Sequence, residues 1–255
     1  MRFKKVFIML AIVMAVSTAC GGKKEESGSA GNAPETESQS EAAPQEENAE
    51  PEKESTEAAE VTKENFRSFP ATDESVFSIK TEGDKAEIEG CKRDIPDKVI
   101  VVPETISGYK VVSVGFGAFT EMENVEAIVL PDSVESIGKS AFTTCEKLRF
   151  VYLGSGLKST GDTMFNYCNA LKEIELPDGT TTMNGCIAGR CSGLEIITIP
   201  ASVQEIQYGI ISPQEFSGVI RTPAGSVAEK NAQELGLKVE NYEPERHRND
   251  REKRR

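Results

Sequence analysis

Residues 125–147 (VEAIVLPDSVESIGKSAFTTCEK) and 148–170 (LRFVYLGSGLKSTGDTMFNYCNA) align without a gap, and this repeat of 23 residues decides the fold. Two further blocks keep the register, LKEIELPDGTTTMNGCIAGRCSG at 171–193 and LEIITIPASVQEIQYGIISPQEF at 194–216. An earlier stretch, VIVVPETISGYKVVSVGFGAF at 99–119, fits the same pattern with an insertion. The aligned columns keep their chemistry, as in the aliphatic column of Ile128, Val151, Ile174 and Ile197.

Each block predicts a short strand, a turn at Pro or Gly, and a second apolar segment. One unit of this length cannot bury its own apolar side chains, whereas stacked units form a continuous core. Alternation along the strand sends Leu148, Val151 and Leu153 inward and leaves Phe150 and Tyr152 pointing outward. The sequence therefore predicts a repeat solenoid with a parallel β-sheet on one face.

Four stretches of the chain carry a resemblance to a known family. IVLPDSVESIGKSAFTTCEKL (128–148) and VVPETISGYKVVSVGFGAF (101–119) resemble the BspA-like leucine-rich repeats of bacterial surface proteins. VIRTPAGSVAEKNAQELGLKV (219–239) is similar to the closing strand and capping helix of that family. FSIKTEGDKAEIEGCK (77–92) is similar to its N-terminal cap, and the resemblance as a whole covers about 99–240.

This resemblance implies a leucine-rich-repeat-like architecture with turns and short helical segments opposite the sheet. It also implies a β-hairpin as the N-terminal cap and a helix as the C-terminal cap. The third and fourth blocks depart from the family pattern, because Ile187-Ala188 and Ile210-Ile211 replace its Ala-Phe pair. For function, the resemblance implies adhesion or interaction with host or neighbouring-cell proteins at the cell surface.

The first twenty residues, MRFKKVFIMLAIVMAVSTAC, predict export and lipid attachment. Basic residues precede an apolar run from Val6 to Val16, which is too short for a membrane-spanning helix and typical of a secretory signal peptide. The small residues before Cys20 resemble a bacterial lipobox, so we expect a signal peptide at 1–19 and a lipid on the Cys20 thiol. The protein would then be extracytoplasmic and anchored to the cell membrane. An ordinary signal peptide cut near Ala19 is the alternative.

Residues 20–65 are acidic and contain no aromatic residue, so the composition predicts a disordered, lipid-anchored linker. We assign residues 66–243 to the solenoid with its caps, with the core repeats at 99–216. The remaining segment, 244–255, is basic and is expected to be disordered. Its basic side chains either contact anionic wall polymers or lipid head groups, or are simply solvated.

The composition excludes several classes of function. The chain has 42 Asp+Glu against 29 Lys+Arg and a formal net charge of −13, which disfavours nucleic-acid binding. Its single His cannot supply a zinc site or a His-based catalytic triad. Nucleophile-elbow, Walker and H-E-x-x-H motifs are missing from the sequence. We therefore expect no enzyme activity, no cofactor and no metal.

A column of cysteines is the main candidate for a metal site or a disulfide. Cys145, Cys168 and Cys191 recur at the repeat period and should stack at the spacing of neighbouring strands. A thiolate metal site or a disulfide is one interpretation, with a bond to Cys186 the most plausible exception. A linear ladder suits tetrahedral zinc poorly, however, and parallel side chains suit a disulfide poorly. The favoured interpretation is a ladder of small buried thiols that fills a repeating slot.

The outward-facing strand positions form the best candidate binding surface. Solenoids use extended faces of this kind for binding, and exposed aromatic or apolar patches often mark contact sites. The alternative is ordinary cross-strand packing of side chains that favour β-sheets. The candidate ligand-binding residues are Val129, Phe150, Tyr152, Glu173, Glu175 and Ile196.

These patterns lead to one functional prediction with one alternative. We expect a non-enzymatic cell-surface module for protein binding or adhesion, which uses Phe150 and Tyr152 as anchors. The alternative is a carbohydrate-binding module, because aromatic rings beside Glu173 and Glu175 could stack on sugars and accept hydrogen bonds from them. The same two carboxylates resemble the paired acids of glycoside hydrolases, but an open sheet offers them no cleft.

Overall fold

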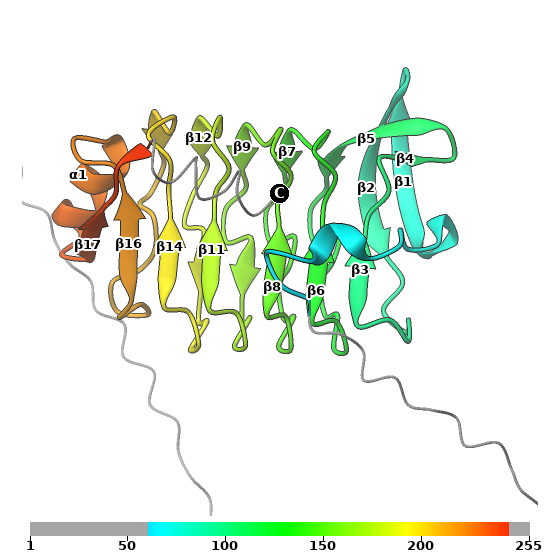
Figure 1. The fold of residues 1–255 in the computed structure, drawn as a ribbon, viewed down its shortest axis with the longest axis horizontal. Coiled ribbons are helices and arrows are strands. Elements are labelled where there is room, and N and C mark those ends of the chain that lie inside the picture. Colours follow the sequence, from blue (N-terminus) through cyan, green and yellow to red (C-terminus); the bar gives the residue numbers. More distant parts are fainter. Residues whose placement is uncertain (1–60, 245–255) are drawn as a thin grey trace, which may run out of the picture. The chain divides into compact units, whose positions relative to one another are not determined.

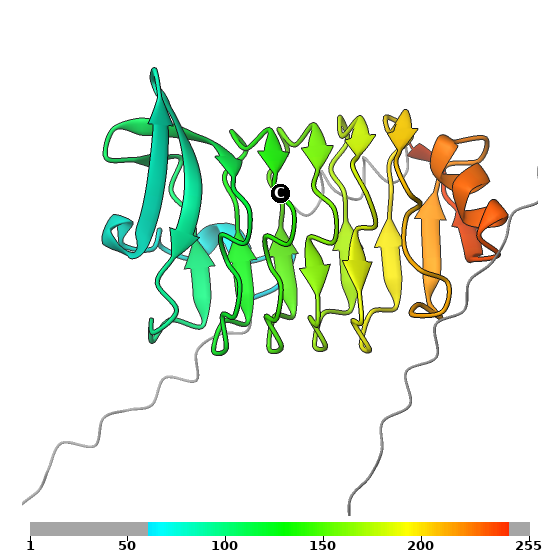
Figure 2. The same ribbon diagram turned by 180° about the vertical axis from the view of Figure 1, so that it is seen from behind.

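A computed structural model describes residues 61–244 of the chain. Within this range the repeats stack as a parallel β-solenoid of about seven turns, which confirms the predicted fold class. Figures 1 and 2 show the rungs in single file between a hairpin at one end and a helix at the other. The signal peptide at 1–19, Cys20, almost all of the predicted linker and the tail from 245 onward lie outside the described residues.

The first strand of each repeat contributes to the face predicted from the sequence. One sheet contains β3 (Val99–Val101), β6 (Ala127–Val129) and β8 (Phe150–Tyr152). A second sheet continues with β11 (Glu173–Glu175), β14 (Ile196–Thr198), β16 (Val219–Thr222) and β17 (Lys238–Asn241). All of these pairs are parallel and follow the repeat register, so that Phe150 lies opposite Ala127 and Glu173 opposite Ile196.

The other side of the solenoid is built of short strands and turns, not of the short helical segments that the resemblance implied (Figure 2). Its main sheet runs through β1 (Phe77–Glu82), β2 (Lys85–Cys91), β5 (Tyr109–Val114), β7 (Ser136–Ile137), β9 (Ser159–Thr160), β12 (Thr182–Met183) and β15 (Glu205–Ile206). A pair of two-residue strands, β10 (Phe165–Asn166) and β13 (Ala188–Gly189), forms a third edge.

Phenylalanine and cysteine columns fill the core between these sheets. Phe119 stacks on Phe142 with ring centroids 5.6 Å apart, and Phe142 stacks on Phe165 at 5.0 Å. The thiols of Cys145 and Cys168 are buried, and each donates a hydrogen bond of 3.0 Å to a backbone carbonyl of the preceding rung. All five cysteines of the described range are free. The column is therefore a ladder of buried thiols.

Glycines let the rungs approach closely at the corner after β5, β7 and β9. A Cβ at Gly161 would lie 2.3 Å from the backbone carbon of Gly138, and one at Gly138 would lie 2.7 Å from that of Gly115. Real side chains essentially never make contacts this short. The glycine at this corner is thus a packing requirement of the stack in these three repeats.

Both ends of the core are closed by other structures. At the N-terminal end β1 and β2 form the expected antiparallel hairpin, whose turn contains Gly83 with a positive φ of 63°. The insertion noted in the first repeat is a second hairpin, in which β4 (Thr105–Ile106) pairs with β5. At the C-terminal end α1 (Val227–Glu234) buries Ala228 and Ala232 against the last rung. No helix in the described range is long and apolar enough to cross a membrane.

Candidate binding face

The outward positions of β3, β6, β8, β11 and β14, here called the strand face, carry the six residues predicted to bind a ligand. Phe150, Tyr152, Glu173, Glu175 and Ile196 are half-buried, and Val129 is only 7% exposed. The expectation of open, solvent-exposed aromatic side chains is therefore wrong. The reason is that another part of the same chain lies on them.

Residues 62–69, here called the strap segment, cross the strand face in front of β3, β6 and β8 (Figure 1). The segment includes the short 3-10 helix η1 (Phe66–Ser68) and continues through η2 (Glu74–Val76) into β1. Its turn is stabilised locally, because the amide of Thr62 donates to the Asn65 side chain at 2.8 Å and the Ser68 hydroxyl donates to the Asn65 carbonyl at 2.7 Å. This turn directs three side chains onto the strand face.

Phe66 is the central contact of the strap segment. Its ring stacks on Tyr152 with a centroid distance of 4.5 Å and lies tilted against Phe150 at 5.8 Å. The side chain is only 8% exposed, although it belongs to no sheet. The two anchors predicted for an external partner are thus already occupied by an aromatic residue of the chain itself.

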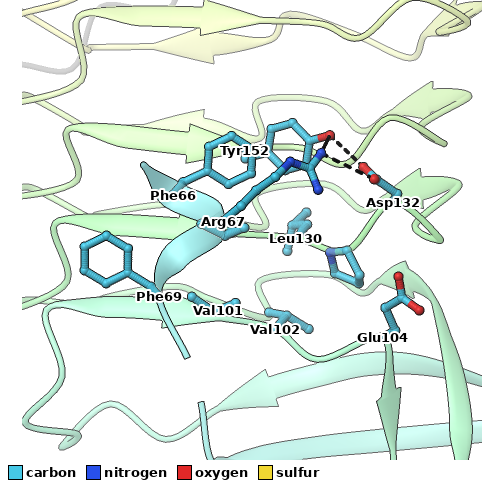
Figure 3. Close-up of a pocket in the computed structure, with 11 residues that line it drawn as sticks. Phe66, Arg67, Phe69, Val101, Val102, Glu104, Leu130, Asp132 and Tyr152 are labelled. Atoms are coloured by element: carbon cyan, nitrogen blue, oxygen red, sulfur yellow. Dashed lines mark hydrogen bonds and ion pairs between the residues drawn. The ribbon is translucent and has the colours of Figure 1, made fainter. Parts of the chain in front are cut away.

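Arg67 makes a second contact beside the rings. Its guanidinium lies 5.3 Å from the centroid of Tyr152, donates a hydrogen bond of 3.1 Å to the Tyr152 hydroxyl and approaches Asp132 at 3.5 Å (Figure 3). The Tyr152 hydroxyl donates to Asp132 at 2.6 Å, and the Ser155 amide donates to the same carboxylate at 2.8 Å. Burial by itself would raise the pKa of Asp132, but these hydrogen bonds outweigh it and lower the pKa below its usual value.

Lys63 makes the third contact, with the paired carboxylates noted in the sequence. Its ammonium lies 2.7 Å from a carboxylate oxygen of Glu173 and 3.1 Å from one of Glu175. The two acids are two residues apart on β11 and therefore project from the same side of the strand. One lysine thus compensates two negative charges that would otherwise repel each other.

A shallow pocket of about 180 Å³ continues the site beyond Arg67 (Figure 3). Its floor is apolar and its rim carries two acids, Glu104 and Asp132. The strap segment supplies one wall and the ends of β3, β6 and β8 supply the rest. The lining residues are Phe66, Arg67, Phe69, Val101, Val102, Glu104, Val129, Leu130, Pro131, Asp132 and Tyr152.

The structure brings five of the six predicted residues into or beside one site, while Ile196 lies one rung further along on β14. The sequence reasoning missed Lys63 because it assigned this residue to the linker at 20–65, and it gave Phe66 and Arg67 no role in the site although it placed them in the domain. A signal was present, since Phe66 is the first aromatic residue after the acidic segment and has basic residues on both sides. Within residues 61–244, no group of three metal-ligating side chains is found.

Comparison with known proteins is consistent with this architecture. Residues 102–216 match the family model of the BspA type leucine rich repeat region in six copies. The leucine-rich repeat protein of T. pallidum (TpLRR) is similar in fold, with 22% identity, a TM-score of 0.55 and coverage of 67% of this chain and 98% of that one. A leucine rich cell surface protein from Faecalibacterium prausnitzii has 23% identity and a TM-score of 0.47 over 67% of this chain and 39% of that protein. No curated protein matches the chain.

Proposed function

From the premise that residues 102–216 form a BspA-type leucine-rich repeat region, we propose that this chain is a non-enzymatic binding module that recognises a protein partner through its strand face. One observation carries the proposal: the strand face already holds a peptide segment by its side chains. Phe66 fills the space over Phe150 and Tyr152, and a basic residue on each side of it meets carboxylates. A rigid sheet with an aromatic centre and a charged rim is a typical protein-binding surface.

The proposed location is the bacterial cell surface, with the lipid on Cys20 as anchor and adhesion as the biological use. Replacing the modified cysteine should release the protein into the medium or leave its signal peptide uncleaved. We expect this of Cys20→Ser, whereas Cys186→Ser should leave membrane association unchanged because that thiol lies in the solenoid. Membrane fractionation with a lipid label measures both, and unchanged association of Cys20→Ser without any label would contradict the anchor.

A carbohydrate partner is the second candidate, favoured by the same rings and carboxylates. Aromatic faces such as those of Phe150 and Tyr152 can stack on sugar rings, and Glu173 and Glu175 can accept hydrogen bonds from sugar hydroxyls. The two candidates differ in a simple competition assay. Soluble glycans would compete for a sugar site, whereas protease treatment of the target surface would remove a protein partner.

The experiment that tests the proposal is a binding screen with the mature chain against matrix proteins and glycans. The double variant Phe150→Ala/Tyr152→Ala removes the aromatic centre of the strand face. A matched control, Phe116→Ala/Tyr208→Ala, removes two aromatic side chains that are 75% and 90% exposed outside this face. We expect a protein ligand that the first variant loses and the control retains. Binding that survives the first variant would place the site elsewhere.

A further inference from the structure

We infer that the strand face selects peptide segments in which an aromatic side chain lies between two basic ones, and that the strap segment is a built-in occupant which such a partner displaces. The inference rests on the proposed function and names the chemistry of its partner. It starts from the spacing of three strap residues. Lys63, Phe66 and Arg67 stand at positions i, i+3 and i+4, which share one side of a helical turn.

Each of these side chains meets a complementary group on the sheet. Lys63 pairs with two carboxylates on β11, and Phe66 stacks on the rings of β8. Arg67 covers the Tyr152 ring and reaches Asp132, whose lowered pKa keeps it charged. A segment with reversed charges would place acids against three carboxylates, so the face discriminates by charge as well as by shape.

The attachment of the strap segment has the character of a reversible contact. The amides of Phe66, Ser68 and Phe69 donate to carbonyls within the segment, so the contacts with the sheet described above come from side chains. The side chains of Lys63 and Arg67 remain 30% and 48% exposed, and ion pairs at such positions contribute little to stability. Backbone pairing with the solenoid begins only at Thr72, whose amide donates to the Val101 carbonyl at 2.9 Å.

The strap segment itself contributes Phe66, Arg67 and Phe69 to the neighbouring pocket, so its displacement opens the floor of this pocket to an external segment. Its apolar lining includes Val101 and Val129, and Glu104 stands at its rim. A partner that continues past the position of Arg67 with an apolar and then a basic side chain would use these groups as well. Such a partner competes with an occupant that is tethered to the site. Its apparent affinity equals its intrinsic affinity multiplied by the fraction of molecules in which the strap segment is detached.

The test uses a labelled peptide of residues 61–69, VTKENFRSF, and the mature chain in two forms. In the open variant, Lys63→Glu/Phe66→Ser, the chain's own segment can no longer compete. We expect saturable binding of the peptide to the open variant with an affinity at least tenfold higher than to the wild type. Equal affinity for the two forms, or no saturable binding to the open variant up to millimolar peptide, would overturn the inference.

A charge exchange supplies the control for specificity. Glu173→Lys/Glu175→Lys in a chain opened by Phe66→Ser alone keeps Lys63, which the new lysines repel; it should abolish binding of VTKENFRSF and permit binding of a peptide with Glu in place of Lys63. If neither peptide bound this variant, charge would not determine which segment the face accepts, and the inference would be overturned. Cooperative unfolding of each variant establishes that it is folded, and Lys63→Glu alone is a milder form of the open variant.

A peptide-display selection on the open variant separates the failure of this inference from the failure of the proposed function. Selected segments with an aromatic residue between basic ones support the inference. Segments of another composition that still require Phe150 and Tyr152 would overturn it and leave the proposed function intact. If no selected segment depends on these two residues, both proposals fail.

Discussion

Tyr152 connects the aromatic and the charged parts of the strand face. Its ring stacks on Phe66, while its hydroxyl accepts a hydrogen bond from Arg67 and donates one of 2.6 Å to Asp132. The residue therefore cannot be described as an exposed anchor alone. It also holds the carboxylate that receives the basic end of the bound segment, and this charge depends on pH.

Tyr152→Phe separates these roles, because it keeps the ring and removes the hydroxyl. The pKa of Asp132 lies below 3.8 in the folded chain, so its hydrogen bonds stabilise the fold above that pH and cease to do so as the pH falls through the lowered pKa. We expect the variant to lose about 1 kcal/mol at pH 7, a value reduced for the partial exposure of the carboxylate. The difference should shrink below about pH 3.8. Urea unfolding across this range measures it, with Tyr109→Phe as the control; a loss independent of pH would contradict the assignment to Asp132.

The glycines at the rung corners allow a second test at the level of single residues. Gly161→Ala places a methyl group 2.3 Å from the Gly138 backbone, so the two rungs must separate. We expect a loss of about 3 kcal/mol in the free energy of unfolding. Gly83→Ala is the matched control, since it meets nothing within 4 Å and has only the cost of its positive φ, about 1 kcal/mol. Similar losses in urea unfolding would mean that the rungs are not packed this tightly.

At the level of elements, periodicity predicted the strands that carry repeated apolar columns and failed where no column exists. The two-residue strands of the second side, such as Ser159–Thr160, are too short to have a signal of their own. They form because the turn between rungs brings their backbone beside that of the previous repeat. The strap segment was missed for a different reason. Its few apolar residues stand beside a long acidic stretch, and its contacts are with residues distant in the sequence.

The departure in the third block is an exchange of side-chain volumes between two neighbouring positions. Compared with Ala141-Phe142, the pair Ile187-Ala188 exchanges the two sizes, because Ile replaces Ala and Ala replaces Phe. All four side chains are buried, so a smaller side chain in one column accompanies a branched one in the next. A sequence pattern that requires the Ala-Phe pair therefore matches the third block poorly, although the core tolerates the exchange.

The C-terminal cap offers a test at this scale. The Ser226 hydroxyl accepts a hydrogen bond of 3.0 Å from the Glu229 amide and thereby caps α1. Ser226→Ala should cost about 1 kcal/mol. Because the cap covers only the last rung, we expect faster hydrogen exchange in α1 and β17 than in the central strands. Gln233→Ala, an exposed change within the same helix, should leave exchange unaltered. Uniformly faster exchange would mean that the cap and the stack open together.

The whole molecule depends on contacts between neighbouring repeats, since no single repeat has a core of its own. Ile174 lies on β11, near the middle of the stack, and is completely buried. Its outward neighbours on the same strand, Glu173 and Glu175, hold the strap segment. One strand thus belongs both to the core and to the candidate binding face, which couples folding to occupancy of the site.

Ile174→Asp tests this dependence, because it buries a charge that has no partner in an apolar column. We expect cooperative loss of the entire solenoid, with the circular dichroism of the sheet and the protection of the strap segment disappearing together. Thr181→Asp introduces the same charge at an exposed position further along the same repeat and should leave the fold intact. If Ile174→Asp instead unfolded only the rungs on one side of β11, the stack would consist of two independently stable halves. The break between the sheets ending at β8 and beginning at β11 marks where they would divide. The strap segment, which contacts both strands, bridges this break together with the pairing of β9 with β12 in the other sheet.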